Sequence, residues 1–442
     1  MTETFAYSLV VDSDLSEFLP EIEFVFDFLD ETYGLVRVAE ADRKVQYGGR
    51  PNQSAAGTLF IPAALFSQGV STDEQGIWPK VDALRKLEDG GTFLPGREGR
   101  VDYDAPGLIF HQLSRIEERV PAEHDSYDRF PFDQTLAARI GRYDDPLADR
   151  AAMDLARAIT GDPARLPLGE YKVMLTHDVD KLRGYNYAHE PIRYALGDVL
   201  KRAEPGRALK RLYRGYFAGL PWSSLNEMMS LSEAHGVKSE FYFIGPSLLA
   251  QDTPYGVTMP DLVKRAADAI RKRGHIIGFH PGHRTCRDQD AWLRQKAALE
   301  DLVGGPLTRG RQHRLEYDFS ITPDIWDAAG MEMDCTPAFP QATGFRTGSC
   351  RPHRAYSLRQ RRALGLRLVS TPIQDFAYFS NGKYRDLSCQ EALEEASSAI
   401  NVCRRYRGTL SVLQHLGQVT EPARGFYREL VGLCFGDSRG TA

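Results

Sequence analysis

The sequence has few cysteines, and none of them stands in a paired spacing. Its six cysteines are scattered single residues, and there is no Cys-x-x-Cys pair. Disulfide frameworks and thiolate zinc sites both need cysteines at short, repeated spacings. We therefore expect reduced, mostly buried thiols rather than a disulfide scaffold or a thiolate metal site.

Long apolar runs and an excess of positive charge are also missing. No stretch reaches the roughly 18–20 consecutive apolar residues that a bilayer span needs. The N-terminus has no Lys or Arg before Arg37, so it lacks the basic part of a signal peptide. The formal net charge is −5, whereas a nucleic-acid surface needs a positive excess. We expect a cytoplasmic protein that has no membrane span and no nucleic-acid partner.

Motifs of several other enzyme classes are absent as well. Neither a phosphate-loop motif nor a Gly-x-Gly-x-x-Gly after a strand occurs, which disfavours a nucleotide-binding enzyme. No Gly-x-Ser-x-Gly elbow is present. A Ser or Cys nucleophile would have to come from Gly348-Ser349-Cys350, with His353 in an Arg-rich loop. This class of hydrolase is therefore disfavoured.

What the sequence does contain is a long alternation of strand-like and helix-like segments after Tyr171, which is typical of parallel βα units. The predicted strands cover 171–176, 238–243, 275–279, 306–311, 331–335, 366–370 and 409–413. Seven units predict an α/β fold, with a barrel over 166–442. A smaller α/β domain is predicted over 1–165, with strands at 58–61 and 108–110 and a helix at 146–159.

Polar residues follow several of these predicted strands, at the barrel face that carries active sites. They are Asp178 and Asp180 after the first strand, His280 and His283 after the third, Arg311 and His313 after the fourth, Arg346 in a Gly-flanked loop of the fifth unit, and His415 after the last. Carboxylates and imidazoles are common ligands of zinc. Each residue alone also fits an ordinary structural role, such as a turn or a hydrogen-bonded histidine, but together they indicate a site.

The order of HDVD, GFHPGH, RQHRL, GFRTG and LQH resembles that of the polysaccharide deacetylase family, the NodB-homology or carbohydrate esterase family 4 group. The resemblance covers about 171–430, and the segment 108–132 resembles an N-terminal domain found in a divergent branch. It implies a distorted (β/α)7 barrel that binds one divalent metal, usually zinc. The implied activity is hydrolysis of the C–N bond of an N-acetyl or similar amide on a sugar.

The resemblance also implies a role for each site residue. Asp178 would be the base and Asp180 a metal ligand. His280 would be the first imidazole ligand, His415 the acid that protonates the leaving amine, and Arg311 the residue that positions Asp178. Independently of the resemblance, the Gly-flanked Arg346 is of the kind used to hold an oxygen-rich substrate.

The third metal ligand is left open by the sequence. The family places a second histidine four residues after the first, but this chain has Arg284 there. Either His283 reaches the metal from an altered turn, or His313 takes that position from the next loop, and we prefer His313.

Two further expectations concern the substrate and the alternative to catalysis. The substrate is expected to be an N-acetylated sugar or glycan intermediate, of the kind used in surface-polysaccharide assembly. The alternative is a carbohydrate-binding barrel that has lost its chemistry. The presence of both aspartates and of His415 favours the enzyme.

The segment 181–220 is strongly basic, with nine Lys or Arg against three acids. Leu209, Leu212, Tyr213, Tyr216 and Phe217 add an apolar stripe at helical spacing. An ordinary solvated helix would explain the charge alone. We expect instead a lid or docking element, in which Lys210, Arg211 and Arg214 contact an anionic substrate such as a diphosphate-linked sugar, or an anionic membrane surface.

Overall fold

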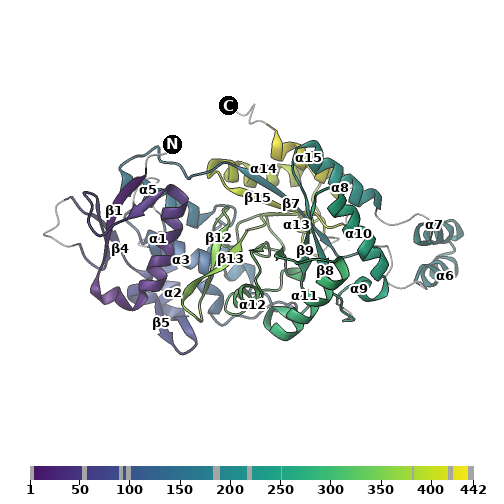
Figure 1. Ribbon diagram of the computed structural model, residues 1–442, viewed down its shortest axis with the longest axis horizontal. Coiled ribbons are helices and arrows are strands. Elements are labelled where there is room, and N and C mark those ends of the chain that lie inside the picture. Colours follow the sequence, from purple (N-terminus) through teal and green to yellow (C-terminus); the bar gives the residue numbers. More distant parts are fainter. Residues whose placement is uncertain are drawn as a thin grey trace. The chain divides into compact units, whose positions relative to one another are not determined.

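The computed structural model describes residues 4–51, 57–88, 93–95, 101–182, 190–216, 222–249, 251–380, 383–416 and 422–436 (Figure 1). The chain forms two compact units. Unit 1 comprises Met1–Lys172, Tyr317–Pro372 and Ser398–Leu410, and unit 2 comprises Val173–Glu316, Ile373–Ser397 and Ser411–Ala442.

Unit 1 contains a four-stranded parallel sheet with the order β2-β1-β3-β4. Its strands are β1 (Phe5–Val11), β2 (Leu35–Arg37), β3 (Lys44–Gly48) and β4 (Leu59–Pro62), and an antiparallel pair is formed by β5 (Val70–Asp73) and β6 (Gly76–Pro79). Its helices include α1 (Leu19–Tyr33), α2 (Val81–Glu88), α3 (Ala105–Ser114), α4 (Leu136–Arg139), α5 (Leu147–Thr160) and α12 (Thr322–Ala328).

Two of the three elements predicted for the first domain are confirmed, by β4 and α5. The predicted strand at 108–110 is wrong, because these residues lie inside α3. The side chain of Asp104 caps this helix by accepting a hydrogen bond from the backbone of Gly107, and Pro106 stands in its first turn. Every residue of α3 is buried, so its continuous apolar run has no amphipathic period to distinguish it from a buried strand.

A nine-stranded sheet has the order β12-β13-β11-β10-β9-β8-β7-β15-β14. Its strands are β7 (Lys172–Val179), β8 (Glu240–Ile244), β9 (Ile276–His280), β10 (Arg309–Gly310), β11 (Met333–Asp334), β12 (His353–Ser357), β13 (Arg362–Leu368), β14 (Ile373–Gln374) and β15 (Thr409–Leu413). The seven predicted strands correspond to β7, β8, β9, β10, β11, β13 and β15. The α/β class is thus confirmed. The (β/α)7 barrel is not confirmed. The strand order of this sheet has two ends, and it includes β12 and β14, which do not correspond to any predicted strand.

The strands of unit 2 pair in parallel, as β10 with β9, β9 with β8, β8 with β7, and β14 with β15. All five residues of β8 are buried, as expected where helices cover both faces of a parallel sheet. The helices of this unit include α6 (Glu190–Arg202), α7 (Pro205–Tyr216), α8 (Trp222–Ala234), α9 (Tyr255–Thr258), α10 (Pro260–Lys272), α11 (Gln289–Val303), α13 (Asp375–Tyr378) and α15 (Ala423–Phe435), and α14 (Cys389–Arg405) has residues in both units.

No helix in the described part of the chain combines the length and the apolar character that crossing a bilayer requires.

Candidate metal centre

The polar residues predicted from the strand ends of unit 2 meet at one edge of the sheet. Asp178 is the last residue but one of β7 and Asp180 follows that strand, and His280 is the last residue of β9. Arg311 directly follows β10, and His415 lies two residues beyond β15. Since these strands are parallel, their carboxyl ends share an edge, which is where open α/β sheets bind ligands.

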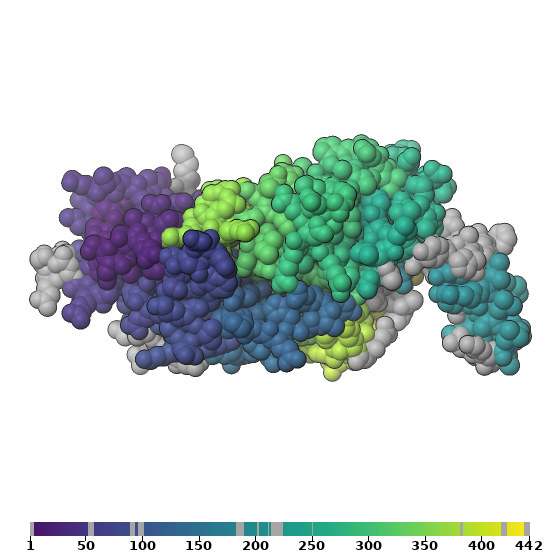
Figure 2. All heavy atoms as spheres, turned by 90° about the horizontal axis from the view of Figure 1, so that it is seen from below, coloured from purple at the N-terminus to yellow at the C-terminus, as the bar shows by residue number. Residues whose placement is uncertain are grey.

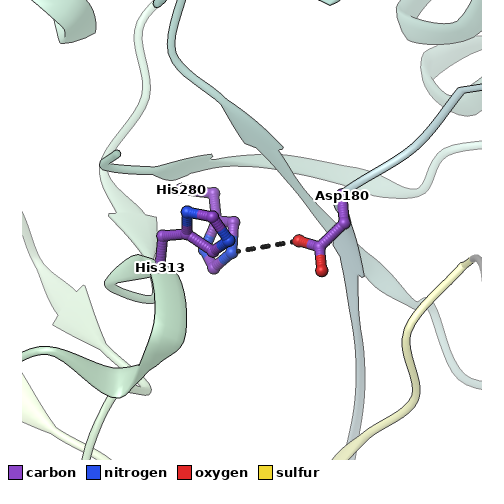
Figure 3. A group of neighbouring side chains, drawn as sticks. All are labelled: Asp180, His280 and His313. Atoms are coloured by element: carbon purple, nitrogen blue, oxygen red, sulfur yellow. Dashed lines mark ion pairs between the residues drawn. The ribbon is translucent and has the colours of Figure 1, made fainter. Parts of the chain in front are cut away.

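The side chains of Asp180 and His280 bring candidate metal-ligand atoms close to that of His313, which lies shortly after β10 (Figure 3). One ligand atom each of Asp180, His280 and His313 lie within 4.8 Å of one another. The His280 Nε2 atom is 3.4 Å from Asp180 Oδ1. Two ligands of a tetrahedral zinc ion bound at ordinary distances would be about 3.4 Å apart. The spacing of this pair therefore matches that of two ligands of one ion.

The hydrogen bonding of these ligand atoms is also what a bound cation would require. Asp180 Oδ1 and His280 Nε2 are buried, and neither has a hydrogen-bond partner among the described residues. Buried polar atoms without partners are costly, so they are usually satisfied by water or by an ion. A carboxylate oxygen and two imidazoles are a donor set that suits a divalent ion such as zinc.

The second nitrogen of each histidine is already bonded. His280 Nδ1 donates to the backbone carbonyl of Arg311 at 2.5 Å. A carbonyl can only accept, so the neutral ring carries no hydrogen on Nε2 and can offer its lone pair there. His313 Nδ1 is 2.9 Å from Asp252 Oδ1. Partners of this kind fix the tautomer and orientation of metal-binding histidines.

His283, the rival candidate for the third ligand, has a different arrangement. Its Nδ1 contacts Glu316 Oε1, and its backbone N–H donates to Asp252 Oδ1 at 2.8 Å. It is buried next to the centre but is not one of the three residues whose ligand atoms converge. These two contacts of His283 therefore connect the turn after β9 to the loops that carry Asp252 and Glu316.

Asp178 is held by a buried guanidinium. Arg311 Nη1 donates to Asp178 Oδ1 at 2.7 Å, and its Nη2 donates to Thr176 Oγ1 at 2.8 Å. Burial raises the pKa of Asp178, but the charges of Arg311, His280 and His415 outweigh burial and hold the pKa below its usual value. Asp178 is therefore ionised at neutral pH and able to accept a proton.

His415 lies on the other side of the same carboxylates. Its Nε2 is 3.9 Å from Asp178 Oδ2 and 3.9 Å from Asp180 Oδ2. Its Nδ1 is 2.6 Å from Asp375 Oδ1, and its backbone N–H donates to Asp375 Oδ2 at 2.9 Å. Burial lowers the pKa of His415, but the charge of Asp375, followed by those of Asp180 and Asp178, raises it to about 10. His415 is thus protonated at neutral pH and can act as an acid.

The remaining predicted substrate contacts are Arg346, Lys210, Arg211 and Arg214. Arg346 belongs to unit 1, where its Nη2 and Nε donate to the carboxylate of Glu118 at 2.8 and 3.1 Å. Lys210 is exposed on α7, and the side chains of Arg211 and Arg214 lie outside the described residues. The substrate contacts predicted for these four residues stay predictions.

Sequence reasoning missed the carboxylates that orient the histidines, namely Asp252, Glu316 and Asp375. For Asp375 the signal would have been a strand prediction at β14, which the sequence analysis does not make, because Gln374 of that strand pairs with Leu413 of β15. This register brings Asp375 next to His415. Asp252 and Glu316 lie in loops and have no such signal.

Comparisons with known proteins give one match to a family model and a set of solved structures. Residues 14–162 match DUF7033, a family of unknown function. A comparison with curated protein sequences finds no match.

The matching structures include a provisionally named polysaccharide deacetylase from Mycobacterium smegmatis, with 18% identity and a TM-score of 0.40 over 62% of this chain and 87% of that one. A family 4 carbohydrate esterase from Streptomyces lividans, in complex with acetate, matches with 12% identity and a TM-score of 0.29 over 60% and 85%. A family 4 pseudoenzyme from Bacillus anthracis matches with 12% identity and a TM-score of 0.29 over 59% and 60%. Because these scores are low, the function of this chain has to be inferred from its own residues.

Proposed function

We propose that this chain is a metal-dependent hydrolase that removes an N-acetyl or similar acyl group from a sugar. The observation that carries the proposal is the convergence of Asp180, His280 and His313, with two buried ligand atoms left without hydrogen-bond partners among the described residues. Asp178 and His415 flank them with opposite charges, as a base and an acid would.

Asp180, His280 and His313 would hold the ion in this proposal. His313 is preferred to His283 because its ligand atom converges with those of the other two residues. A divalent cation bound there, for which zinc suits the donor set, would polarise the amide carbonyl and make water a stronger acid.

The residues of the chain supply the proton transfers. Asp178, kept ionised by Arg311, takes a proton from the water that attacks the carbonyl carbon. His415, kept protonated by Asp375, donates a proton to the amide nitrogen as the C–N bond breaks. The amine and the carboxylate are the two products, so one molecule of water is consumed for each acyl group removed.

The nature of the substrate is inferred from the motif order that resembles polysaccharide deacetylases. We propose an N-acetylated sugar intermediate of surface-polysaccharide assembly, handled in the cytoplasm.

The test is acetate release from a panel of N-acetylated sugars, both free and diphosphate-linked, with the protein supplied with zinc or treated with a chelator. We expect release that the chelator stops and zinc restores, and release at least about 100-fold slower from Asp178→Asn. A zinc-loaded protein that binds a panel member but releases no acetate would overturn catalysis and favour a carbohydrate-binding barrel.

A further inference from the structure

The helical hairpin of α6 and α7 buries its small residues and exposes its large ones. The two helices pack side by side and are coloured teal in Figures 1 and 2. Ala195 and Ala208 are each only 4% exposed, and Asp198 is fully buried, with Arg207 Nε 3.8 Å from it. Among the described side chains of the hairpin, the buried ones are these three and Pro191.

The large apolar side chains of the hairpin lie on its outside. Leu200 is 80% exposed, Leu209 70%, Tyr213 62%, Leu196 55% and Ile192 50%. Ile192, Leu196 and Leu200 are four residues apart and share one face of α6, as Leu209 and Tyr213 do on α7. A hairpin surrounded by water would place these residues inside and its alanines outside. Exposed apolar groups of this size indicate a binding surface.

The charge of the hairpin indicates what it binds. Residues 190–216 contain seven Lys or Arg and three acids, although the whole chain has a net charge of −5. Each of the three acids is within reach of an arginine of the hairpin itself: Glu190 is 3.7 Å from Arg193, and Asp198 and Glu204 are 3.8 and 3.1 Å from Arg207. With seven basic residues against three acids, the hairpin keeps a surplus of four positive charges.

We propose that the α6–α7 hairpin docks this protein on the surface of an anionic lipid bilayer. Exposed aliphatic residues, tyrosines and surplus Lys or Arg on short helices are the features of segments that lie in the membrane interface. The helices have 13 and 12 residues, too few to cross a bilayer, so they lie on it. A second copy of the chain fits less well, because it would bring two positive hairpins together. The proposal concerns localisation and does not depend on hydrolysis.

The test is cosedimentation of the full-length protein with vesicles of phosphatidylcholine alone or mixed with phosphatidylglycerol. We expect the mixed vesicles to bind the protein more strongly, and added salt to weaken that binding. Changing Leu200→Gln together with Leu209→Gln should lower binding to mixed vesicles at least about tenfold, because both side chains lose their apolar contact.

A matched control is available elsewhere in unit 2. Leu248 and Leu249 are 70% and 48% exposed, and Leu248→Gln with Leu249→Gln should leave vesicle binding unchanged. Circular dichroism checks that all variants fold. Absence of binding by the unaltered protein, or equal loss in both double variants, would overturn the proposal.

Two other outcomes would assign the hairpin a role other than membrane docking. If the Leu200 and Leu209 variant dissociates a dimer seen by ultracentrifugation while vesicle binding is unchanged, the surface serves a second copy. If it changes only the KM for a soluble acetylated sugar, the hairpin is a lid. Both results contradict membrane docking. Since vesicle binding is measured without substrate, failure of the hydrolase proposal would leave this test unaffected.

Discussion

Single hydrogen bonds decide which atoms of the candidate centre are available for chemistry. His280, His313 and His415 each have Nδ1 next to an oxygen, from a carbonyl or a carboxylate. Such contacts fix the ring orientation. Nε2 of His280 then faces Asp180, and Nε2 of His415 faces Asp178 and Asp180. The same contacts separate the roles, because Asp375 lies against the proposed acid and Asp252 against a proposed metal ligand.

Asp178→Asn should keep the metal but reduce hydrolysis by about 100-fold to 10,000-fold, which is the usual contribution of one general base. The amide can still accept a hydrogen bond from Arg311 but cannot take a proton from water. Elemental analysis and acetate release check the two parts separately. Turnover near that of the unaltered protein would show that Asp178 is not the base.

Asp375→Asn should shift the alkaline limb of the pH–rate profile to lower pH. The protonated form of His415 is the acid, so activity falls as pH rises through its pKa, which the charge of Asp375 raises. Removing the carboxylate charge that raises this pKa most should move the limb down by about 1–3 units.

Asp252→Asn is the matched control for that experiment, because it removes an equivalent carboxylate from His313. It should lower metal affinity by about 10-fold to 100-fold and leave the alkaline limb in place at saturating zinc. An equal shift of the limb in both variants would contradict the separate roles of the two carboxylates.

At the scale of helices and strands, the sequence predicts most of the sheet that carries the site. The strands of unit 2 were found because they combine β-branched and aromatic residues with polar groups at their ends. The residues of the proposed centre were predicted for the same reason, since they lie at strand ends or shortly after them. The strand predicted at 108–110 failed because α3 is buried on all sides and so has no helical period.

The orienting carboxylates were harder to predict because they depend on tertiary contacts. Asp252 and His313 are 61 residues apart, and Glu316 and His283 are 33 apart. Residues so far apart in the sequence have no local spacing from which such pairs could be predicted. Only Asp375 is brought to its histidine by strand pairing, through the register of β14 and β15.

The strand β7 should make stability depend on pH through His177. This residue is fully buried, its Nδ1 donates to the carbonyl of Gln414 at 3.0 Å, and burial lowers its pKa to about 3. The unfolded chain binds a proton near pH 6.5, but the folded chain does not until about pH 3. The contribution to stability is therefore complete above pH 6.5 and is lost as pH falls from there toward 3.

His177→Asn should reduce that pH dependence. Asparagine can still donate a hydrogen bond to Gln414 but does not titrate. The free energy of unfolding, from urea denaturation at pH 7.5 and 5.5, should fall less in the variant than in the unaltered protein, by about 1.4 kcal/mol over this pH interval. Identical losses in the two proteins would show that His177 is not a source of the dependence.

At the scale of the whole molecule, the two units are made of interleaved segments. A boundary near residue 166 lies close to the first crossing, at Lys172. The later return of Tyr317–Pro372 and Ser398–Leu410 to unit 1 has no local signal in the sequence, because these segments have the same strand and helix patterns as their neighbours. What assigns them to unit 1 is their packing, which strand and helix periodicity does not encode.

Unit 1 has its own cluster of metal-ligand residue types, so metal content tests which cluster binds. Glu88, His111 and Glu117 have ligand atoms within 4.8 Å of one another. Both ring nitrogens of His111 are engaged, however, because Glu88 lies 3.0 Å from Nε2 and Gln112 lies 3.1 Å from Nδ1. Arginines pair with both acids: Arg115 is 2.7 Å from Glu117, and Arg85 and Arg139 contact Glu88. Guanidinium groups occupy the positions that a cation would need.

Elemental analysis of the purified protein should therefore find about one divalent ion per chain, bound in unit 2. Asp180→Ala with His280→Ala should abolish it, because two of the three ligands are lost and one coordination partner cannot retain the ion. His111→Asn should leave the metal content unchanged, provided circular dichroism shows that the variant folds. Loss of the ion in folded His111→Asn, with retention in the Asp180 and His280 double variant, would move the metal site to unit 1. The same result would remove the basis for the proposed hydrolysis, because Asp178 and His415 would then flank no metal.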